Sequence, residues 1–145
     1  MKWYKGDLHS HTTFSDGKDT LTEVLTRVQE YGLDFFALTE HRTLEHIRHF
    51  PKESKLLLIP AFEFGSELGH ANIFNISELL EVNVSMDEEI TKKSLLEAKD
   101  KGAYISINHP FNYEVPWKIN VDECTYDWVE IWNGPWFNSN EPALD

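Results

Sequence analysis

Two histidines separated by one residue lie near the N-terminus of the chain and could bind a metal. In the segment GDLHSHTTFSDG, His9 and His11 follow the first apolar stretch. Side chains at positions i and i+2 of a strand share a face, so both imidazoles are expected to point the same way. Two converging neutral imidazoles are half of a metal site. An isolated H-x-H pair is more often two ordinary polar residues in a turn, so the rest of the sequence has to decide.

Further residues of this chemistry recur where other expected strands end. His41 ends ALTEH, Glu63 lies near the end of IPAFEFG, His70 opens GHANIF just after that strand's turn, and His109 ends ISINHP. In parallel β/α architectures the carboxyl ends of strands are where active sites form. The sequence therefore predicts one metal-binding edge that collects five histidines and a carboxylate: His9, His11, His41, Glu63, His70 and His109.

The ligand types narrow the choice of metal. Imidazole and carboxylate without thiolate suit Zn, Fe or Mn and disfavour the all-oxygen shells of Ca or Mg. The set exceeds the needs of one ion, which predicts two to three divalent metal ions with Glu63 as a bridge. Metals clustered about 3.5–4 Å apart are the usual arrangement for hydrolysing phosphate esters. We therefore expect an enzyme, a metal-dependent phosphoesterase in which a metal-bound hydroxide attacks phosphorus, with no catalytic residue beyond the metal ligands.

Some polar residues near this edge carry weaker signals. Asp16 in the SDG turn is either a turn-forming residue or a further metal ligand. Arg42 directly follows His41 and either binds a substrate phosphate or faces solvent. His46 and His49, three residues apart in LEHIRHF, are expected to be surface residues.

The elements that would position these residues alternate along the chain. Helices are predicted over residues 19–34, where Thr20 and Glu23 have capping-box spacing, and over residues 85–102, capped by Ser85 or Asp87. Several of the expected strands are continuously apolar, which is typical of strands buried on both faces. The pattern predicts a mainly parallel α/β fold, either an open doubly wound sheet or part of a barrel. The six expected strands cover residues 3–9, 34–41, 55–66, 70–77, 103–110 and 127–133.

Composition bounds the remaining properties. The 145 residues are expected to form a single domain, and the net charge of −12 argues against general binding of nucleic acid or of an anionic membrane. The single cysteine, Cys124, excludes an internal disulfide. The N-terminus lacks the apolar region of a signal peptide, and a cytoplasmic location is the default expectation.

Several segments together resemble the PHP domain family, the polymerase-and-histidinol-phosphatase family of metal-dependent phosphoesterases. In family order from about residue 7 to 136 they are DLHSHTTFSDG, DFFALTEH, IPAFEF, GHANIF, INHP and VEIWNGPW. The resemblance implies a distorted (β/α)7 barrel with up to three metal ions at the carboxyl ends of its strands. It also implies three ligand sets: His9, His11 and Glu63 for one metal; Glu63, His70 and His109 for a second; Asp16 and His41 contributing to a third.

The sequence departs from the family pattern in two places. Glu40 stands where the family usually has Asp, in its T-D-H segment. The late Ser-Asp-x-His segment, which supplies an aspartate and a histidine, is absent from these 145 residues. A closed barrel of seven or eight units usually needs about 200 residues or more. We therefore expect a truncated PHP-like domain with an incomplete barrel of about six strands, whose open strand edges invite self-association.

Three functional alternatives follow. The first is hydrolysis of a small phosphorylated substrate, either a phosphomonoester, a nucleotide, or a sugar or amino-acid phosphate. The second is a non-catalytic metal-binding fragment of such a domain. The third is an amidohydrolase-like hydrolase, a class that also begins with H-x-H but usually carries a bridging lysine on a middle strand, where this sequence has Glu63.

Overall fold

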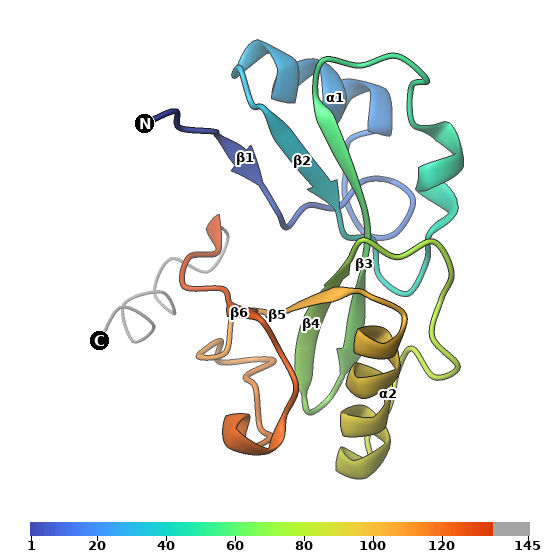
Figure 1. The fold of residues 1–145 in the computed structure, drawn as a ribbon, viewed down its shortest axis with the longest axis vertical. Helices are drawn as coiled ribbons and strands as arrows, with labels where there is room; N and C mark the ends of the chain where they lie inside the picture. Colours follow the sequence, from blue (N-terminus) through green and yellow to red (C-terminus); the bar gives the residue numbers. More distant parts are fainter. Residues whose placement is uncertain (135–145) are drawn as a thin grey trace.

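One curled sheet of six strands organises the chain. The computed structural model describes residues 1–134. Spatial neighbours in the sheet follow the order of the sequence, and the sheet forms a half-barrel (Figure 1). This α/β arrangement agrees with the expected incomplete barrel. The strands are β1 (Gly6–Asp7), β2 (Phe35–Leu38), β3 (Leu57–Ser66), β4 (Gly69–Phe74), β5 (Tyr104–Ile107) and β6 (Trp128–Val129).

The strand directions are mixed. β1, β2 and β3 are parallel to one another, and β5 is parallel to β6. β4 runs antiparallel to both β3 and β5, because only Glu67 and Leu68 connect it to β3 and so short a connection forces a hairpin. The hairpin returns His70 opposite Gly65, so a residue at the start of β4 reaches the level of the carboxyl end of β3.

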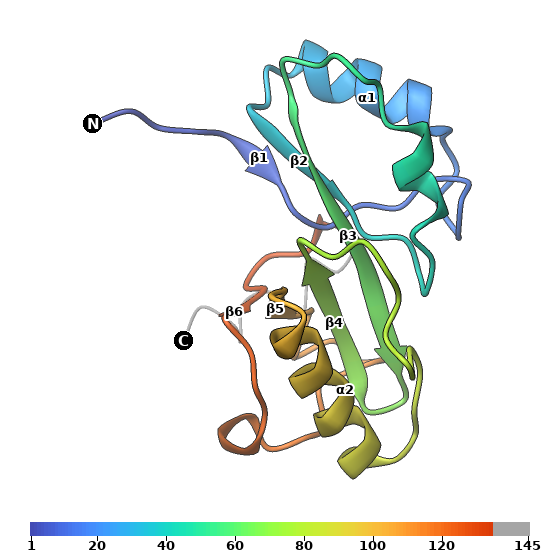
Figure 2. The same ribbon diagram turned by 45° about the vertical axis from the view of Figure 1, so that its right-hand side comes forward.

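β3 is the longest strand and joins the two halves of the sheet (Figure 2). Its first part pairs with β2 and its second part with β4. Its side chains alternate between faces: Phe62 and Phe64 are buried in the apolar cluster beneath the second helix, whereas Glu63 points to the other face. This alternation places a carboxylate inside the half-barrel.

Two helices cover the sheet. Helix α1 (Leu21–Glu30) packs Leu21, Leu25 and Val28 against β2. Its start is fixed by the predicted capping box, in which the Thr20 hydroxyl accepts from the Glu23 backbone and the Glu23 carboxylate accepts from the Thr20 backbone. The two helices lie over different halves of the sheet (Figure 2).

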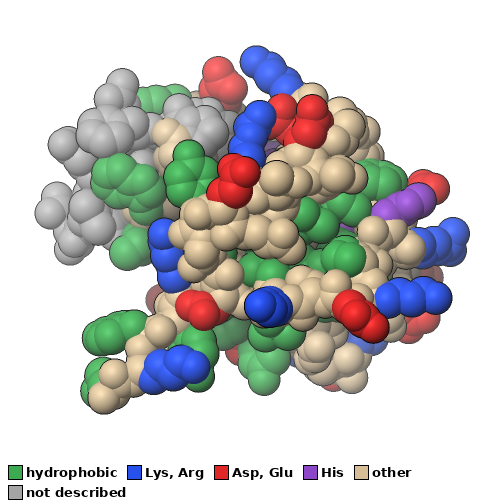
Figure 3. All heavy atoms as spheres, turned by 90° about the horizontal axis from the view of Figure 1, so that it is seen from above, with side chains coloured by type: hydrophobic (Ala, Val, Ile, Leu, Met, Phe, Trp, Pro, Cys, Tyr) green, Lys and Arg blue, Asp and Glu red, His purple; other side chains and the backbone are tan. Residues whose placement is uncertain are grey.

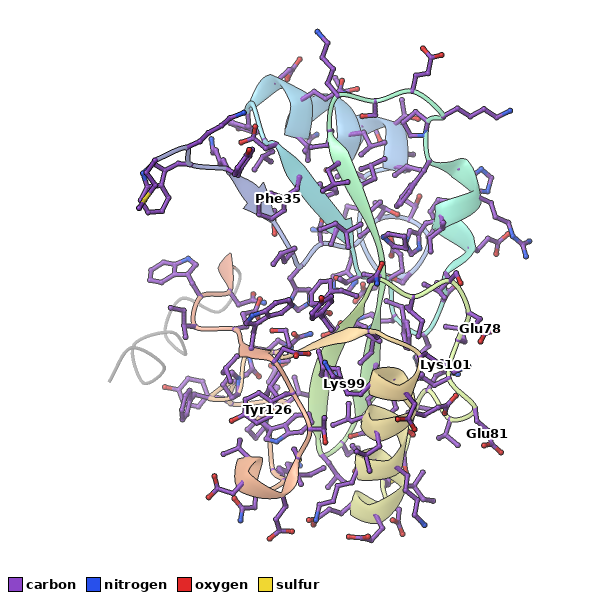
Figure 4. All side chains as sticks on the ribbon, in the orientation of Figure 1. Phe35, Glu78, Glu81, Lys99, Lys101 and Tyr126 are labelled. Carbon is purple, nitrogen blue, oxygen red and sulfur yellow. The ribbon has the colours of Figure 1, made fainter. Side chains whose placement is uncertain are left out.

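Helix α2 (Glu88–Asp100) packs Leu95 and Ala98 over β3, β4 and β5. Asp87 caps its start by accepting from the Ile90 backbone, one of the two predicted alternatives. At its end Lys101 lies 2.7 Å from Glu78 on the preceding loop, and Lys99 reaches towards β5 and β6 (Figure 4).

Three sequence expectations need correction. The first strand covers only Gly6 and Asp7, so His9 and His11 lie in the loop after it and not within a strand. β4 breaks the mainly parallel pattern, as described above. His46 is fully buried in a short 3-10 helix, η1 (Glu45–His49), and is not a surface residue. Its ring packs against Phe14 and Phe50.

On the face shown in Figure 3, acidic and basic side chains are interspersed with hydrophobic ones. A second 3-10 turn, η2 (Val121–Glu123), precedes β6. Among the described residues, no helix has the length and apolar character that crossing a membrane requires.

Candidate metal centre

The loop between β1 and α1 carries three of the predicted ligands, His9, His11 and Asp16. Its turn is closed by backbone hydrogen bonds from Ser15 and Gly17 to the carbonyl of Thr12. Gly17 lies so close to this turn that a Cβ atom there would meet the His11 carbonyl oxygen at 2.4 Å. The rings of His9 and His11 have centroids 5.2 Å apart, so the loop brings them together although no strand does.

Glu40, just beyond β2, holds this loop in place. Its fully buried carboxylate accepts from the backbone and hydroxyl of Thr12 and from the hydroxyl of Ser15. The next residue, His41, forms an isolated parallel bridge with Glu63, which fixes its position beside β3. The segment TEH therefore contacts the ligand-bearing loop through Glu40 and strand β3 through His41.

Glu63 is the centre around which the histidines gather. Its side chain is 1% exposed, and its two carboxylate oxygens are approached from several directions. The ring-nitrogen distances to its nearer oxygen are 3.0 Å for His41, 3.2 Å for His70, 3.4 Å for His9, 3.4 Å for His11 and 3.7 Å for His109. Asn108 adds a buried hydrogen bond of 2.8 Å from its side-chain amide to Glu63.

The potential ligand atoms form three groups, each within 4.8 Å: His9, His11 and Glu63; His11, Asp16 and His41; and Glu63, His70 and His109. All seven predicted ligand residues thus lie in one constellation, and the groups match the ligand sets that the family resemblance implied, with His11 also within reach of the third. Asp16 is the outermost member, with 66% of its side chain exposed, and lies 3.2 Å from His41.

Burial and the shared carboxylate shift the pKa values in this cluster. Burial alone would raise the pKa of Glu63, but the surrounding histidines, His109 and His41 foremost, hold it well below its ordinary value. Burial works to lower the pKa of His9, yet contacts with Glu130 and Glu63 outweigh it and raise the pKa to about 10. Burial lowers the pKa of His11 to about 4. Glu63 raises the pKa of His41 by hydrogen bonding.

These shifts describe a donor set that suits a divalent cation. Glu63 is ionised, and the histidines around its carboxylate favour that charged form. A bound cation would balance the same negative charge and would displace protons from the ring nitrogens that it contacts. Imidazole nitrogens and carboxylate oxygens are ligands for Zn, Fe and Mn. The residues present therefore fit bound metal.

The groups open into a cavity of about 410 Å³. The described residues that line it are His9, His11, Asp16, Gly17, His41, Glu63, His70, His109, Val115 and Asn133. Arg42, the predicted substrate-binding residue, does not belong to this lining: its side chain is exposed, and its backbone has a φ of 55° while its N–H donates to the Glu63 carbonyl.

Two residues that sequence reasoning missed belong to the site. Asn108 precedes His109 and binds the central carboxylate. Glu130, directly after β6, lies 2.9 Å from Nδ1 of His9 and accepts from the His109 backbone at 2.8 Å. Glu130 lies in the middle of the expected strand 127–133, so no signal in the sequence marked it; in the structure β6 ends one residue earlier, at Val129.

The comparisons with known proteins agree on one family. The family model of the PHP domain matches residues 7–110. A probable histidinol-phosphatase from Thermotoga maritima is 31% identical over 68 residues, which is 43% of this chain and 29% of that protein.

Two solved structures resemble the fold. A two-domain protein from Bacteroides vulgatus, which contains a predicted PHP-like metal-dependent phosphoesterase, has a TM-score of 0.55 and 29% identity, over 74% of this chain and 35% of that one. A protein from Bifidobacterium adolescentis, described as a metal-dependent phosphoesterase, has a TM-score of 0.54 at 14% identity, over 97% of this chain and 82% of that one. The second likeness concerns the fold alone. The match spans 29% of the Thermotoga maritima protein and 35% of the Bacteroides vulgatus protein.

Proposed function

The chain belongs to the PHP domain family, and from that premise we propose that it hydrolyses phosphate esters with two or three divalent metal ions held by residues of the half-barrel. The observation that carries the proposal is the convergence of five histidines and two carboxylates on one cavity. We further propose that residues 1–145 form one domain.

The charge of the cavity supports bound cations. Glu63 and Asp16 line the same space, so a phosphate group that entered it would be repelled by both carboxylates. Bound divalent ions invert this local field. When present, such ions polarise phosphoryl oxygens and lower the pKa of water, which is the chemistry that phosphate ester hydrolysis requires.

The chain's own residues then have distinct roles. Glu63 is shared by two of the three groups, so we propose that it bridges two metals. His11 has a lowered pKa and is therefore neutral at pH 7, ready to act as a ligand. Asp16 and His41 complete the third group at the exposed mouth of the cavity. Arg42 lies outside the lining, so we propose that it meets only a part of a substrate that extends beyond the metals.

The substrate class is a small phosphomonoester. The residues of the three ligand groups line a cavity of about 410 Å³, a volume that suits a small molecule. The name of the similar Thermotoga maritima protein makes histidinol phosphate one member of the panel to test.

The test combines metal content with turnover. The 145-residue chain is purified, its metals are counted by elemental analysis, and release of phosphate is measured from p-nitrophenyl phosphate, histidinol phosphate, a nucleotide and a sugar phosphate. We expect two or more Zn, Fe or Mn ions per chain and release from at least one ester, both lost in the double variant H9A/H11A. The control H49A changes an exposed histidine outside the cavity and should keep both. Bound metals without release from any ester would instead identify a metal-binding protein without turnover.

A further inference from the structure

We propose that Glu130 is a positioning residue for the metal centre: it orients the ring of His9 and the backbone of His109 together. The proposal rests on the proposed function, because it assumes that His9 and His109 are metal ligands. It adds a residue outside all three ligand groups and gives it a separate task.

The contacts of Glu130 link distant parts of the chain. Its Oε1 lies 2.9 Å from Nδ1 of His9, a residue 121 positions earlier, and its Oε2 accepts from the His109 N–H at 2.8 Å. His9 follows edge strand β1, and Glu130 follows edge strand β6. These two edges border the open side of the half-barrel (Figures 1 and 2), so the carboxylate connects the strands that no pairing joins among the described residues.

The contact with His9 decides which ring nitrogen can bind a metal. A carboxylate can only accept, so Nδ1 of His9 must carry the proton that it shares with Glu130. When the ring loses its second proton, as metal binding requires, the unshared electron pair is on Nε2. Nε2 is the atom that lies 3.4 Å from Glu63, on the side of the first ligand group. A carboxylate behind a metal-binding histidine is a known way of fixing its tautomer and orientation.

The contact with His109 holds an unfavourable backbone. His109 has a φ of 28°, in the left-handed region that non-glycine residues rarely adopt. The hydrogen bond from its N–H to Glu130 helps to retain this conformation, which turns the ring so that Nε2 lies 3.7 Å from Glu63. His109 belongs to the second ligand group, so one carboxylate acts on two groups.

The double contact explains why a carboxylate is needed. Two acceptor oxygens serve two donors, and the side-chain amide of Asn133 donates to both at 3.3 Å. A glutamine has the same shape but only one acceptor oxygen, so it can serve either His9 or the His109 backbone but not both. Glu130→Gln therefore removes the function with little change of volume.

The experiment measures metal binding and the state of the His9 ring, not turnover. Zn²⁺ affinity and stoichiometry of the metal-free chain are determined by chelator competition for the wild type and Glu130→Gln. The tautomer of His9 is read from the ¹⁵N and ¹H signals of its imidazole in the zinc-loaded protein. Glu53→Gln, at an exposed glutamate far from the cavity, is the matched control. Thermal unfolding of the metal-free proteins checks that the variant is folded.

We expect Glu130→Gln to bind Zn²⁺ about 10–100-fold more weakly, while Glu53→Gln binds like the wild type. In the wild type the His9 Nδ1 proton should be observed and protected from exchange, and in Glu130→Gln it should broaden or shift. Wild-type affinity together with an unchanged Nδ1 signal in a folded Glu130→Gln would overturn the proposal, and so would a wild type that binds no Zn²⁺. A wild type that binds Zn²⁺ through a protected His9 but cleaves no ester would contradict only the proposed function.

Discussion

The carboxylate of Glu40 accepts hydrogen bonds from both the backbone and the hydroxyl of Thr12, which lies 28 positions earlier, and both residues are fully buried. Glu40 also accepts from Ser15. These three donors belong to the loop that presents His11 and Asp16, so the glutamate acts as an internal clamp on two candidate ligands. The longer side chain at the family's usual aspartate position therefore has a structural use in this chain.

Glu40→Ala is expected to destabilise the protein. It would leave the buried N–H and hydroxyl of Thr12 without their acceptor, which should cost about 2–4 kcal/mol in the free energy of unfolding. Urea denaturation of the metal-free protein measures this. Glu53→Ala, at an exposed position, should change the same quantity by less than about 0.5 kcal/mol. Equal effects of the two substitutions would show that Glu40 is not a clamp.

Changes at Glu63 and Asp16 should remove different numbers of metals. Glu63 belongs to two ligand groups and Asp16 to one, so Glu63→Gln should lose more ions than Asp16→Asn. Elemental analysis after dialysis, with circular dichroism as a check of folding, gives the count per chain. The reverse order would mean that Glu63 supports the histidines without binding metal.

The elements were predictable where local signals agree. The capping box of α1, the Asp87 cap of α2 and the apolar runs of β2, β3 and β5 are all visible in the sequence. The ends of the elements were less predictable. The expected strand 3–9 shortened to Gly6–Asp7, because its pairing with β2 covers only Phe35 and Phe36. Propensity gives no information about where the pairing of two strands stops, and here it stops before β2 ends at Leu38.

The site was predictable for a different reason. Histidines at strand ends pointed to one edge, and all of the predicted ligands lie together there. Glu130 and Asn108 were missed because their roles depend on contacts with residues 121 and 45 positions away, which no local spacing reveals. His46 was misjudged for the same reason, since its burial comes from packing against Phe14 as well as its neighbour Phe50.

Two lysine–carboxylate pairs of similar length should differ in strength. Lys99 and Asp127 are 2.8 Å apart and partly buried, and Asp127 also accepts from the Ile105 backbone. Lys101 and Glu78 are 2.7 Å apart, with Glu78 70% exposed. Asp127→Ala should lower the free energy of unfolding by about 1–3 kcal/mol, because it leaves the Ile105 N–H without this acceptor. Glu78→Ala should lower it by clearly less, because solvent screens this exposed pair. Urea denaturation compares them, and similar losses would refute the distinction.

His46 should make folding sensitive to mild acid. Burial lowers its pKa from 6.5 to about 4, so the unfolded chain binds a proton that the folded chain rejects. Its stabilising effect is complete above pH 6.5 and is lost as pH falls towards 4, amounting to roughly 1–2 kcal/mol between pH 7 and pH 5. His46→Leu removes this contribution. The difference in unfolding free energy between wild type and His46→Leu, measured at both pH values, cancels the titration of the other histidines. A difference that does not change with pH would show that folding leaves the pKa of His46 unchanged.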